Sequence, residues 1–581
     1  MQIVQGRKVL IVFLILLIIA SFLRLYRISD VPVSLFGDEL DVGYHAYSIL
    51  KTGRDYSGNF MPLHFHSLAE FRTPLFLYSA VPTVAIFGIS PLGVRLPAAI
   101  FGVLGVLCIF LLVREVSQDN LLALAASATL TFSPWHIQYS RAAFEVTQLL
   151  FFLLGGLYFY FKALKGDGKW LVVATVGLSL TIWIYSTAKL FTPFLIFFLF
   201  FLYRRELLKL PKKHLFLSLI VGFFLIAPFF YTVFWGGGAQ RFGYLSVFTD
   251  PTVEPEVGTA RLVDAQMRGE KGLGLSPSIQ DRVFHNKFVL WGSKIANNYF
   301  ESFSSDFFFN KGDPNLRHSI EGVGQFYKIE SVALILGLLL FFTNFNNKKF
   351  KFLIVFWLLA GVIPSSITRD GGRHATRLIL ILPPLVFLMA YGLLGTLRKL
   401  KGYLRFVFLV IYLLVFTLEF VSYQHNYWVH NPSYSERWWH AGFREAINEI
   451  KKLEDEYSKV IISTQNEPPW IFFAAWYEFP PDLWQREFPL NNKVNLDGYG
   501  EISHIGKFYF GSPQEKDIYG WYKVLNLDTL YLATEKEVKI NLILEPERVP
   551  AGIKLVKSIP FPSGEPAFYL FSGDEKTNLQ Q

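Results

Sequence analysis

Cysteine, charge and internal repetition are all scarce in this chain of 581 residues. The single cysteine, Cys108, lies inside an apolar run, which excludes an intramolecular disulfide and a cysteine metal site. Only 17% of the residues are charged, whereas 52% are hydrophobic, and this balance excludes an ordinary soluble enzyme. The sequence contains neither a low-complexity segment nor a repeat of about 20 to 50 residues. The composition therefore predicts a polytopic membrane protein.

The basic residues do not form one continuous face. The net charge of +9 could indicate a nucleic-acid partner, but the lysines and arginines sit in short clusters between apolar runs. Such clusters are typical of topology signals in membrane proteins. We therefore expect a lipid bilayer as the surrounding phase and no nucleic acid as partner.

Eleven apolar runs are long enough, or nearly so, to cross a bilayer as helices. The first follows Arg7-Lys8 and has no small-residue cleavage site before Arg24, so we interpret it as a retained signal anchor. The runs lie at about 9–23, 95–113, 121–138, 146–161, 170–188, 190–203, 215–235, 329–345, 352–368, 378–397 and 403–421.

A twelfth apolar segment, 74–91, contains Pro82 and Gly88. If it stays on the outer side as a re-entrant or interfacial segment, four of the five cytoplasmic loops are basic, as the positive-inside rule requires. If it spans, the basic clusters fall outside. We therefore expect eleven spans in the cytoplasmic (inner) membrane, with the N-terminus in the cytoplasm and the C-terminus outside.

The composition changes after about residue 423, and this change predicts two domains. Residues 1–422 form a transmembrane module with long outer loops at 24–94 and 234–328, and residues 423–581 form an extracytoplasmic soluble α/β domain. Within the latter we expect a helix near 441–457. Strands are expected at 459–464, 507–510, 529–533, 539–544 and 567–571.

Two adjacent carboxylates, Asp38 and Glu39, stand in the first outer loop close to the predicted membrane border. Ionised groups near hydrocarbon cost several kcal/mol unless they are hydrated, paired or used in function. A solvated loop acid is the alternative reading. The pair is the first candidate for outward-facing chemistry.

Five motifs in the same order resemble one known group. They resemble the membrane glycosyltransferases of the C-type (GT-C) fold, in the branch of protein O-mannosyltransferases and lipid A aminoarabinose transferases. The resemblance is dense over about residues 9–165, looser through 420, and says little about the remaining residues. The motifs are Asp38-Glu39, the segment Ala46 to Asp55, Arg72-Thr73-Pro74 continuing to Tyr78, Val94-Arg95-Leu96-Pro97-Ala98, and Ser133-Pro134-Trp135 with Ser140-Arg141.

The resemblance implies transfer of a pentose or hexose from a polyprenyl-phosphate carrier to an acceptor, by direct displacement with inversion. Asp38 matches the catalytic base of the family, and Glu39 is expected to position the acceptor or to stabilise charge around Asp38. The chemistry is consistent, because inverting transfer needs a carboxylate for the acceptor proton and a cation for the leaving phosphate.

The resemblance also provides cations for the donor phosphate. Arg72 stands where the aminoarabinose transferases have a lysine, and Arg241 resembles a second phosphate-binding arginine of that branch. A guanidinium binds phosphate as a fork, whereas an ammonium acts as a point charge. The alternative for both is an interfacial arginine that extends towards the headgroups.

A further basic pair, Arg317 and His318, ends the long outer loop. It could bind the donor phosphate or simply pack the loop. One histidine with scattered carboxylates is a poor metal signature, so no cofactor is indicated and a divalent metal stays open. Other candidate contacts to substrate or lipid headgroups are Tyr78, Arg141, Arg373, His374 and Arg377.

Other functions remain open at this stage. An oligosaccharide transferase or polysaccharide ligase on the same fold would share the site and differ in the donor. A lipid or solute transporter would place charges near the middle of its spans, which are almost free of them here. The acceptor, a lipid, protein or glycan that bears a hydroxyl or phosphate, is not identified by the residues, and neither is the sugar.

Overall fold

The computed structural model describes residues 2–68, 70–235, 240–270, 277–466, 468–487, 504–513, 515 and 517–574. By length and composition, eight helices in this part of the chain could cross a membrane, and three shorter apolar helices accompany them. Together with the mostly helical secondary structure, these helices confirm the predicted polytopic α-helical membrane protein.

Each of the eleven predicted spans falls on a helix, although two break earlier than expected. The run 121–138 breaks at Ser133-Pro134, and the run 170–188 breaks near Tyr185. The helices are α1 (Gln2–Leu25), α4 (Pro91–Ser117), α5 (Asn120–Phe132), α7 (Val146–Ala163), α8 (Lys169–Leu180), α9 (Ser186–Leu207), α10 (Lys212–Trp235), α15 (Lys328–Asn344), α16 (Lys348–Ser366), α18 (Leu382–Lys399) and α19 (Gly402–His425).

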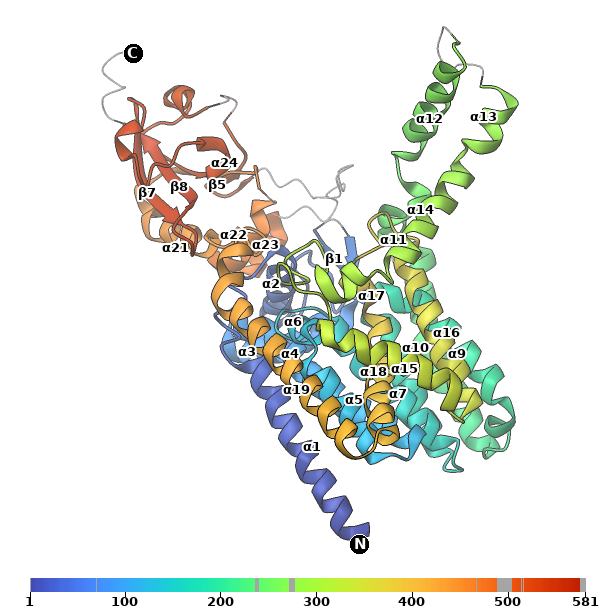
Figure 1. Cartoon of the computed structure of the whole chain (residues 1–581). Coiled ribbons are helices and arrows are strands. Elements are labelled where there is room, and N and C mark those ends of the chain that lie inside the picture. The colour runs from blue at the N-terminus through green and yellow to red at the C-terminus, as the bar shows by residue number, and fades with distance from the viewer. Residues whose placement is uncertain are drawn as a thin grey trace. The chain divides into compact units, whose positions relative to one another are not determined.

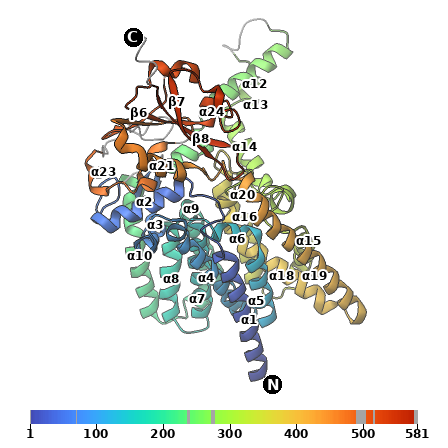
Figure 2. The same ribbon diagram turned by 90° about the vertical axis from the view of Figure 1, so that its left-hand side faces the viewer.

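Close packing of apolar helices forms the first of two compact units, which contains residues 1–20, 102–138 and 146–423. Within it α15 lies against α18 (Figure 1). α8 lies against both α7 and α10 (Figure 2). Gly337 and Gly392 let α15 and α18 meet, because a Cβ at either position would lie 2.1 Å or less from a backbone oxygen of the other helix. Many phenylalanines of α10, such as Phe223 and Phe224, point outward, as lipid-facing side chains do.

The apolar segment 74–91 forms the short helix α3 (Pro74–Phe87). It has 14 residues, fewer than the ~20 that a spanning helix needs. It ends at Gly88, whose φ of 67° few other residues adopt. Its length agrees with the interfacial placement that we predicted from the basic loops.

The second compact unit joins two parts of the chain that are far apart in sequence. It contains residues 21–101 and 139–145 together with residues 424–581. Its early part holds α2 (Gly37–Thr52), the hairpin β1 (Phe65–Ser67) and β2 (Glu70–Arg72), and α3. Its late part holds α20 (Asn431–Tyr434), α21 (Phe443–Leu453), α22 (Pro469–Tyr477), α23 (Pro481–Glu487) and α24 (Glu535–Val538).

A six-stranded sheet in the order β4-β5-β3-β6-β8-β7 is the centre of the late part, and its strands β6, β7 and β8 are labelled in Figure 2. Its strands are β3 (Lys459–Ile462), β4 (His504–Ile505), β5 (Phe508–Phe510), β6 (Thr529–Thr534), β7 (Ile553–Pro560) and β8 (Pro566–Gly573). β3 pairs in parallel with β5 and β6, and the other pairs are antiparallel. The predicted combination of helices and a sheet in the C-terminal part is therefore confirmed. The boundary at residue 423 and the extracytoplasmic placement stay predictions.

Alternation along β6 builds a core on both faces of this sheet. Leu530 and Leu532 pack with α21 and α22, while Tyr531 and Ala533 pack with Trp521 on the other face. One predicted strand, 539–544, is wrong. Lys539 adopts a left-handed conformation with φ 56°. The side-chain oxygen of Asn541 accepts hydrogen bonds from the backbone N–H groups of Ile543 and Leu544, so the segment forms a turn.

The helix that carries Asp38 is supported by the late part of the same unit. α2 packs against α22 and α23. The Tyr44 hydroxyl donates to the Phe479 carbonyl at 3.0 Å, and the Gln485 amide donates to Ser48 and Thr52 at 3.0 Å each. These contacts order α2, which would be marginal as an isolated 16-residue helix.

Candidate functional site

Asp38 lies in the first turn of α2, where the backbone N–H groups favour a negative charge. Its side chain is 48% exposed, and its Oδ1 lies 2.5 Å from Nη2 of Arg72. Arg72 also donates through Nη1 to the Asp38 carbonyl at 3.3 Å. The β1–β2 hairpin supplies this guanidinium, since Arg72 ends β2 opposite Phe65. Asp38 and Arg72, both predicted site residues, are thus brought together.

A second acid, Asp41, lies on the same helix and contacts the same guanidinium. It is fully buried, its Oδ1 accepts a hydrogen bond of 2.7 Å from Tyr56, and its Oδ2 lies 3.7 Å from Nη1 of Arg72. Burial raises the pKa of Asp41, and the charge of Arg72 offsets part of this rise. Arg72 therefore bridges two carboxylates, one exposed and one buried.

His45 lies one turn further along α2 and closes the buried side of the site. Its ring stacks on Tyr56 with 3.8 Å between centroids, and its Nε2 lies 3.3 Å from the Ser67 hydroxyl. Burial lowers the pKa of His45 to about 3, so the ring is neutral at pH 7. The neutral ring holds Tyr56 against Asp41.

The sequence reasoning missed Asp41, His45 and Tyr56. The signal was available for the first two, because Asp38, Asp41 and His45 are spaced i, i+3 and i+7 and share one face of a helix. Tyr56 carries no comparable signal, since only the turn after α2 brings it back to that face.

Glu39, in contrast, points away from the exposed acid and is fully buried. Its two carboxylate oxygens accept hydrogen bonds of 2.8 Å from Nε and Nη2 of Arg95, and Oε1 also accepts from the Ala143 amide at 2.8 Å. Arg95 in turn donates to the carbonyls of Ile28, Pro32 and Ser34. The pair ties the start of α2 to the preceding loop.

Arg141 and Tyr78 are also occupied by contacts within the chain. Arg141 is fully buried, and it donates to the hydroxyl of Tyr427 and to the carbonyls of Leu23 and Val31 at 2.8 to 3.0 Å. The Tyr78 hydroxyl donates to the Pro62 carbonyl at 2.8 Å, and burial raises its pKa to about 12. In this arrangement both side chains order the early part of the second unit.

A separate polar cluster lies in the first unit. Asp313, His318 and His374 each offer one ligand atom, and these atoms lie within 4.8 Å of one another. The Asp313 Oδ2 accepts hydrogen bonds from His318 Nδ1 at 3.0 Å and from the Ala375 amide at 2.8 Å. Burial alone would raise the pKa of Asp313, but the nearby imidazoles and the Ala375 amide lower it overall. Two imidazoles and one carboxylate form a donor set that suits zinc or another divalent metal.

The remaining predicted cations of the first unit are largely paired. Arg373 Nε lies 2.7 Å from Glu301, and Arg377 lies 2.5 Å from Asp370 and 2.7 Å from the Thr368 hydroxyl. The Arg317 Nε donates to the Asn315 side chain at 3.3 Å. Arg241 belongs to α11 (Gln240–Leu245), but its side chain lies outside the described residues.

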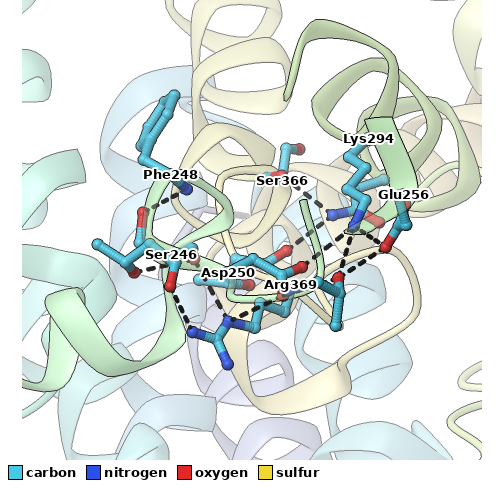
Figure 3. A network of polar contacts seen from close by, with 11 residues as sticks. Ser246, Phe248, Asp250, Glu256, Lys294, Ser366 and Arg369 are labelled. Atoms are coloured by element: carbon cyan, nitrogen blue, oxygen red, sulfur yellow. Dashed lines mark hydrogen bonds and ion pairs between the residues drawn. The ribbon is translucent and has the colours of Figure 1, made fainter. Parts of the chain in front are cut away.

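The turn after α16, which carries Arg373 and Arg377, is fixed by a polar network (Figure 3). Lys294 of α14 (Lys287–Glu301) donates to Asp250 at 3.1 Å and to Glu256 at 2.8 Å, and Arg369 donates to the carbonyl of Ser246 at 3.5 Å. Asn298 donates to the carbonyls of Ser366 and Thr368. The long outer loop and the turn after α16 are thereby joined.

Next to this turn lies a cavity of about 410 Å³ with mostly apolar walls and two cations. Lys189 of α9 and Arg377 contribute the charges, and Phe229, Phe242 and Ile367 contribute apolar surface. Sequence reasoning did not single out Lys189, although a lysine inside an apolar helix is a functional signal by default. The combination suits an amphiphile with an anionic head.

Comparisons with known proteins agree with this architecture. Residues 72–232 match the family model described as dolichyl-phosphate-mannose-protein mannosyltransferase. This stretch includes Arg72, Tyr78, Arg95 and Arg141, whereas Asp38 precedes it. No curated protein sequence matches the chain.

Two solved structures have a similar fold. The archaeal oligosaccharyltransferase AglB from Archaeoglobus fulgidus, in complex with an inhibitory peptide and a dolichol-phosphate, matches with a TM-score of 0.51 and 15% identity. The match covers 81% of this chain and 64% of AglB, so the chain spans less than two thirds of that relative. ArnT from Cupriavidus metallidurans in the apo state matches with a TM-score of 0.50 and 11% identity, over 97% of this chain and 98% of ArnT.

The fold and the family match define the class of protein. The chain is a multi-pass membrane protein with the C-type fold, which glycosyltransferases and oligosaccharyltransferases share. The resemblance predicted from the motifs is therefore confirmed. More particularly, residues 72–232 are similar to the family model described as dolichyl-phosphate-mannose-protein mannosyltransferase.

Proposed function

We propose that this protein is a membrane glycosyltransferase that moves one sugar from a polyprenyl-phosphate carrier to an acceptor hydroxyl on the outer face of the cytoplasmic membrane. One observation carries the proposal: a half-exposed carboxylate, Asp38, is held 2.5 Å from the guanidinium of Arg72, which a buried acid also contacts. This pair supports the proposal, because inverting transfer needs a base for the acceptor proton and a cation for the leaving phosphate.

Asp38 acts as the general base. It removes the proton of the acceptor hydroxyl while the acceptor oxygen forms its bond to the anomeric carbon and the bond to the phosphate oxygen breaks. Arg72 binds the leaving phosphate through its planar fork. Asp41 supports this role, because its carboxylate remains close to Arg72 when a phosphate competes with Asp38 for the guanidinium.

Glu39 acts as a positioning residue in this proposal. Its bidentate contact with Arg95 and its bond from the Ala143 amide hold the first turn of α2, and so hold Asp38. The buried ring of His45 and the hydroxyl of Tyr56 do the same for Asp41.

The donor lipid is bound by groups of the first unit. The cavity with Lys189 and Arg377 suits a phosphate head on an apolar chain. Arg241, Arg317 and His318 are proposed as further cations for the donor phosphate, as the sequence suggested. Arg373 and His374 are proposed as contacts to the substrate or to lipid headgroups. Where a divalent metal binds, Asp313, His318 and His374 would hold it, and it would supply positive charge to an anion bound there.

An oligosaccharide transferase is the second candidate. The structural likeness to AglB, an oligosaccharyltransferase, favours it at the level of the fold. It would use the same base and would differ in the donor, with more than one sugar on the carrier. The identity of the transferred sugar, hexose or pentose, does not distinguish the two candidates. The test must therefore vary the number of sugars on the donor.

The test is sugar transfer by the purified protein in liposomes. A panel of radiolabelled polyprenyl-phosphate donors, some with one sugar and some with an oligosaccharide on the carrier, is supplied with a membrane extract as acceptor, for the wild type and for Asp38→Asn. We expect one donor to be consumed by the wild type, and about 10²- to 10⁴-fold less rapidly by the variant, because the amide keeps the shape and cannot take the proton.

Asp30→Asn is the matched control, since Asp30 is an exposed acid of the same loop that pairs with Arg27. It should transfer at the wild-type rate. Normal transfer by Asp38→Asn would remove the proposed base, and consumption of oligosaccharide donors alone would establish the second candidate. The labelled product identifies the acceptor.

A further inference from the structure

The sheet of the second unit has a point where the strand order reverses. The chain forms β3, then builds β4 and β5 on one side of it, and later adds β6 on the other side. β3 runs parallel to both of its neighbours. In open α/β sheets the crevice outside the carboxyl ends of such strands is the usual place for a ligand.

A cavity of about 150 Å³ lies at this place. Asn466 follows the carboxyl end of β3 by four residues, and Glu535 and Lys536 follow directly after β6. Arg437 and His440, which precede α21, complete the polar part of the lining. None of these residues belongs to the site around Asp38.

The segment before α21 folds tightly to reach the cavity. Gly442 has φ 91°, and a Cβ there would lie 2.9 Å from the Ala567 Cβ. His440 itself adopts a left-handed conformation with φ 50°. Sparsely populated backbone conformations of this kind are often found at binding sites.

Two acceptor atoms of the lining are buried and lack a partner. The Glu535 Oε2 and the Asn466 Oδ1 have no hydrogen-bond partner among the residues that the structure describes. Burial raises the pKa of Glu535, while the Asn466 side chain and the charges of Lys536 and Arg437 offset part of this rise. Buried acceptors without a partner are costly, and a ligand with hydroxyl donors would satisfy them.

The charges of the lining are balanced, which selects a neutral ligand. Arg437 is already paired with Glu565 at 2.7 Å, and Lys536 faces a cavity that also contains the carboxylate of Glu535. A phosphate or nucleotide would meet that carboxylate and would be repelled. A purely apolar ligand would leave the buried oxygens unsatisfied.

Phenylalanine side chains form the remaining walls. Phe561 lies under the Arg437 guanidinium at 4.9 Å, and Phe443 and Phe568 line the cavity beside it. Aromatic faces stack on the C–H face of a sugar ring, while carboxylate and amide oxygens accept from its hydroxyls. Planar polar groups beside aromatic rings are therefore the chemistry that recognises a carbohydrate.

We propose that this cavity, lined by Arg437, His440, Asn466 and Glu535 over phenylalanine walls, binds one monosaccharide unit of a neutral carbohydrate. Its volume admits a single ring and excludes an oligosaccharide, so the rest of a glycan would extend into solvent. The assignment of the bound sugar to the acceptor rests on the proposed glycosyltransferase function. The binding of a sugar in this cavity does not depend on that function.

Saturation-transfer difference NMR on the full-length protein in nanodiscs tests the proposal. The probes are the methyl glycosides of glucose, galactose, mannose and arabinose. At least one should receive saturation from the wild type. Glu535→Gln should weaken its binding about tenfold or more, since hydrogen bonds to a charged acceptor are lost. Asn466→Phe should abolish it by filling the cavity.

Glu545→Gln is the matched control, because Glu545 is an exposed acid of the same domain that pairs with Arg548. It should bind as the wild type does, and so should Asp38→Asn, whose change lies at the other site. No saturation of any methyl glycoside, full binding by Glu535→Gln and Asn466→Phe, or loss in Asp38→Asn would each overturn the proposal. If sugar transfer fails but the Glu535-dependent signal persists, the cavity binds sugar and the proposed enzyme function is what has failed.

Discussion

The guanidinium of Arg95 donates two parallel hydrogen bonds of 2.8 Å to the carboxylate of Glu39, and both side chains are completely buried. The two residues are 56 positions apart in the chain. Adjacent carboxylates thus have different environments: Asp38 is half exposed beside Arg72, while Glu39 is sealed in an internal ion pair. The first is available for chemistry and the second for structure.

Glu39→Gln should destabilise the protein by about 3–5 kcal/mol, because it leaves the buried charge of Arg95 without a countercharge. Denaturant unfolding in micelles measures the change. Glu545→Gln, which breaks an exposed pair, should stay within about 1 kcal/mol of the wild type. If Glu39→Gln unfolds like that control, the pair does not hold the start of α2.

Arg72→Lys should lower kcat/KM for the donor about 10- to 100-fold, although the charge is kept. An ammonium cannot contact Asp38, Asp41 and a phosphate in one plane, and a charge-assisted hydrogen bond is worth about 1.5–3 kcal/mol. Arg72→Gln should lower it further. Initial rates over a range of donor concentrations provide the measurement, and equal rates for lysine and arginine would show that only the charge matters.

Acid should destabilise the site through His45. The pKa of its buried ring is lowered to about 3, below the ordinary value of about 6.5, so the stability of the neutral ring is present above pH 6.5 and is lost as the pH falls towards 3. The loss is about 1.4 kcal/mol for each pH unit in this window. The raised pKa of Asp41 acts in the opposite direction, because its protonation favours the folded state.

His45→Phe isolates this effect, since phenylalanine keeps a ring against Tyr56 and does not titrate. Unfolding free energies at pH 7 and pH 5 should fall less for this variant than for the wild type. The exposed His504 offers the control, and His504→Asn should follow the wild type. Parallel curves for all three proteins would contradict the neutral buried ring.

Lys294→Met should loosen the long outer loop. Lys294 joins Asp250, Thr252 and Glu256, so its loss frees α12 (Val253–Met267) from α14 (Figure 3). Hydrogen exchange of the α12 and α14 amides should become faster. Lys311→Met removes a more exposed lysine that pairs with Asp306, and it should leave this exchange unchanged. Unchanged exchange in Lys294→Met would show that the network does not order the loop.

Local patterns accounted for the long apolar helices and for four of the five predicted strands, whereas α2 and most of the shorter helices were not predicted. Apolar runs end where charge or proline begins, so α1, α4 and α7 lie close to their predicted bounds. The segment 539–544 has the apolar content of a strand, and Ile540 and Leu542 do pack in a core. A turn buries these two side chains as well as a strand does, so composition cannot distinguish a turn from a strand here.

The sequence by itself determined the membrane class and, through its motifs, the C-type fold. It placed Asp38 in a loop, whereas the structure places it in the first turn of α2. The tertiary structure alone decided which acid is exposed and which cation it meets, because Arg72 reaches Asp38 from a hairpin 34 residues away, and Arg95 reaches Glu39 from another helix. Hydrophobic runs consist of residues that are neighbours in the sequence, so they can be recognised without the structure. Ion pairs and cavities depend on distances between segments that only the packed chain brings together.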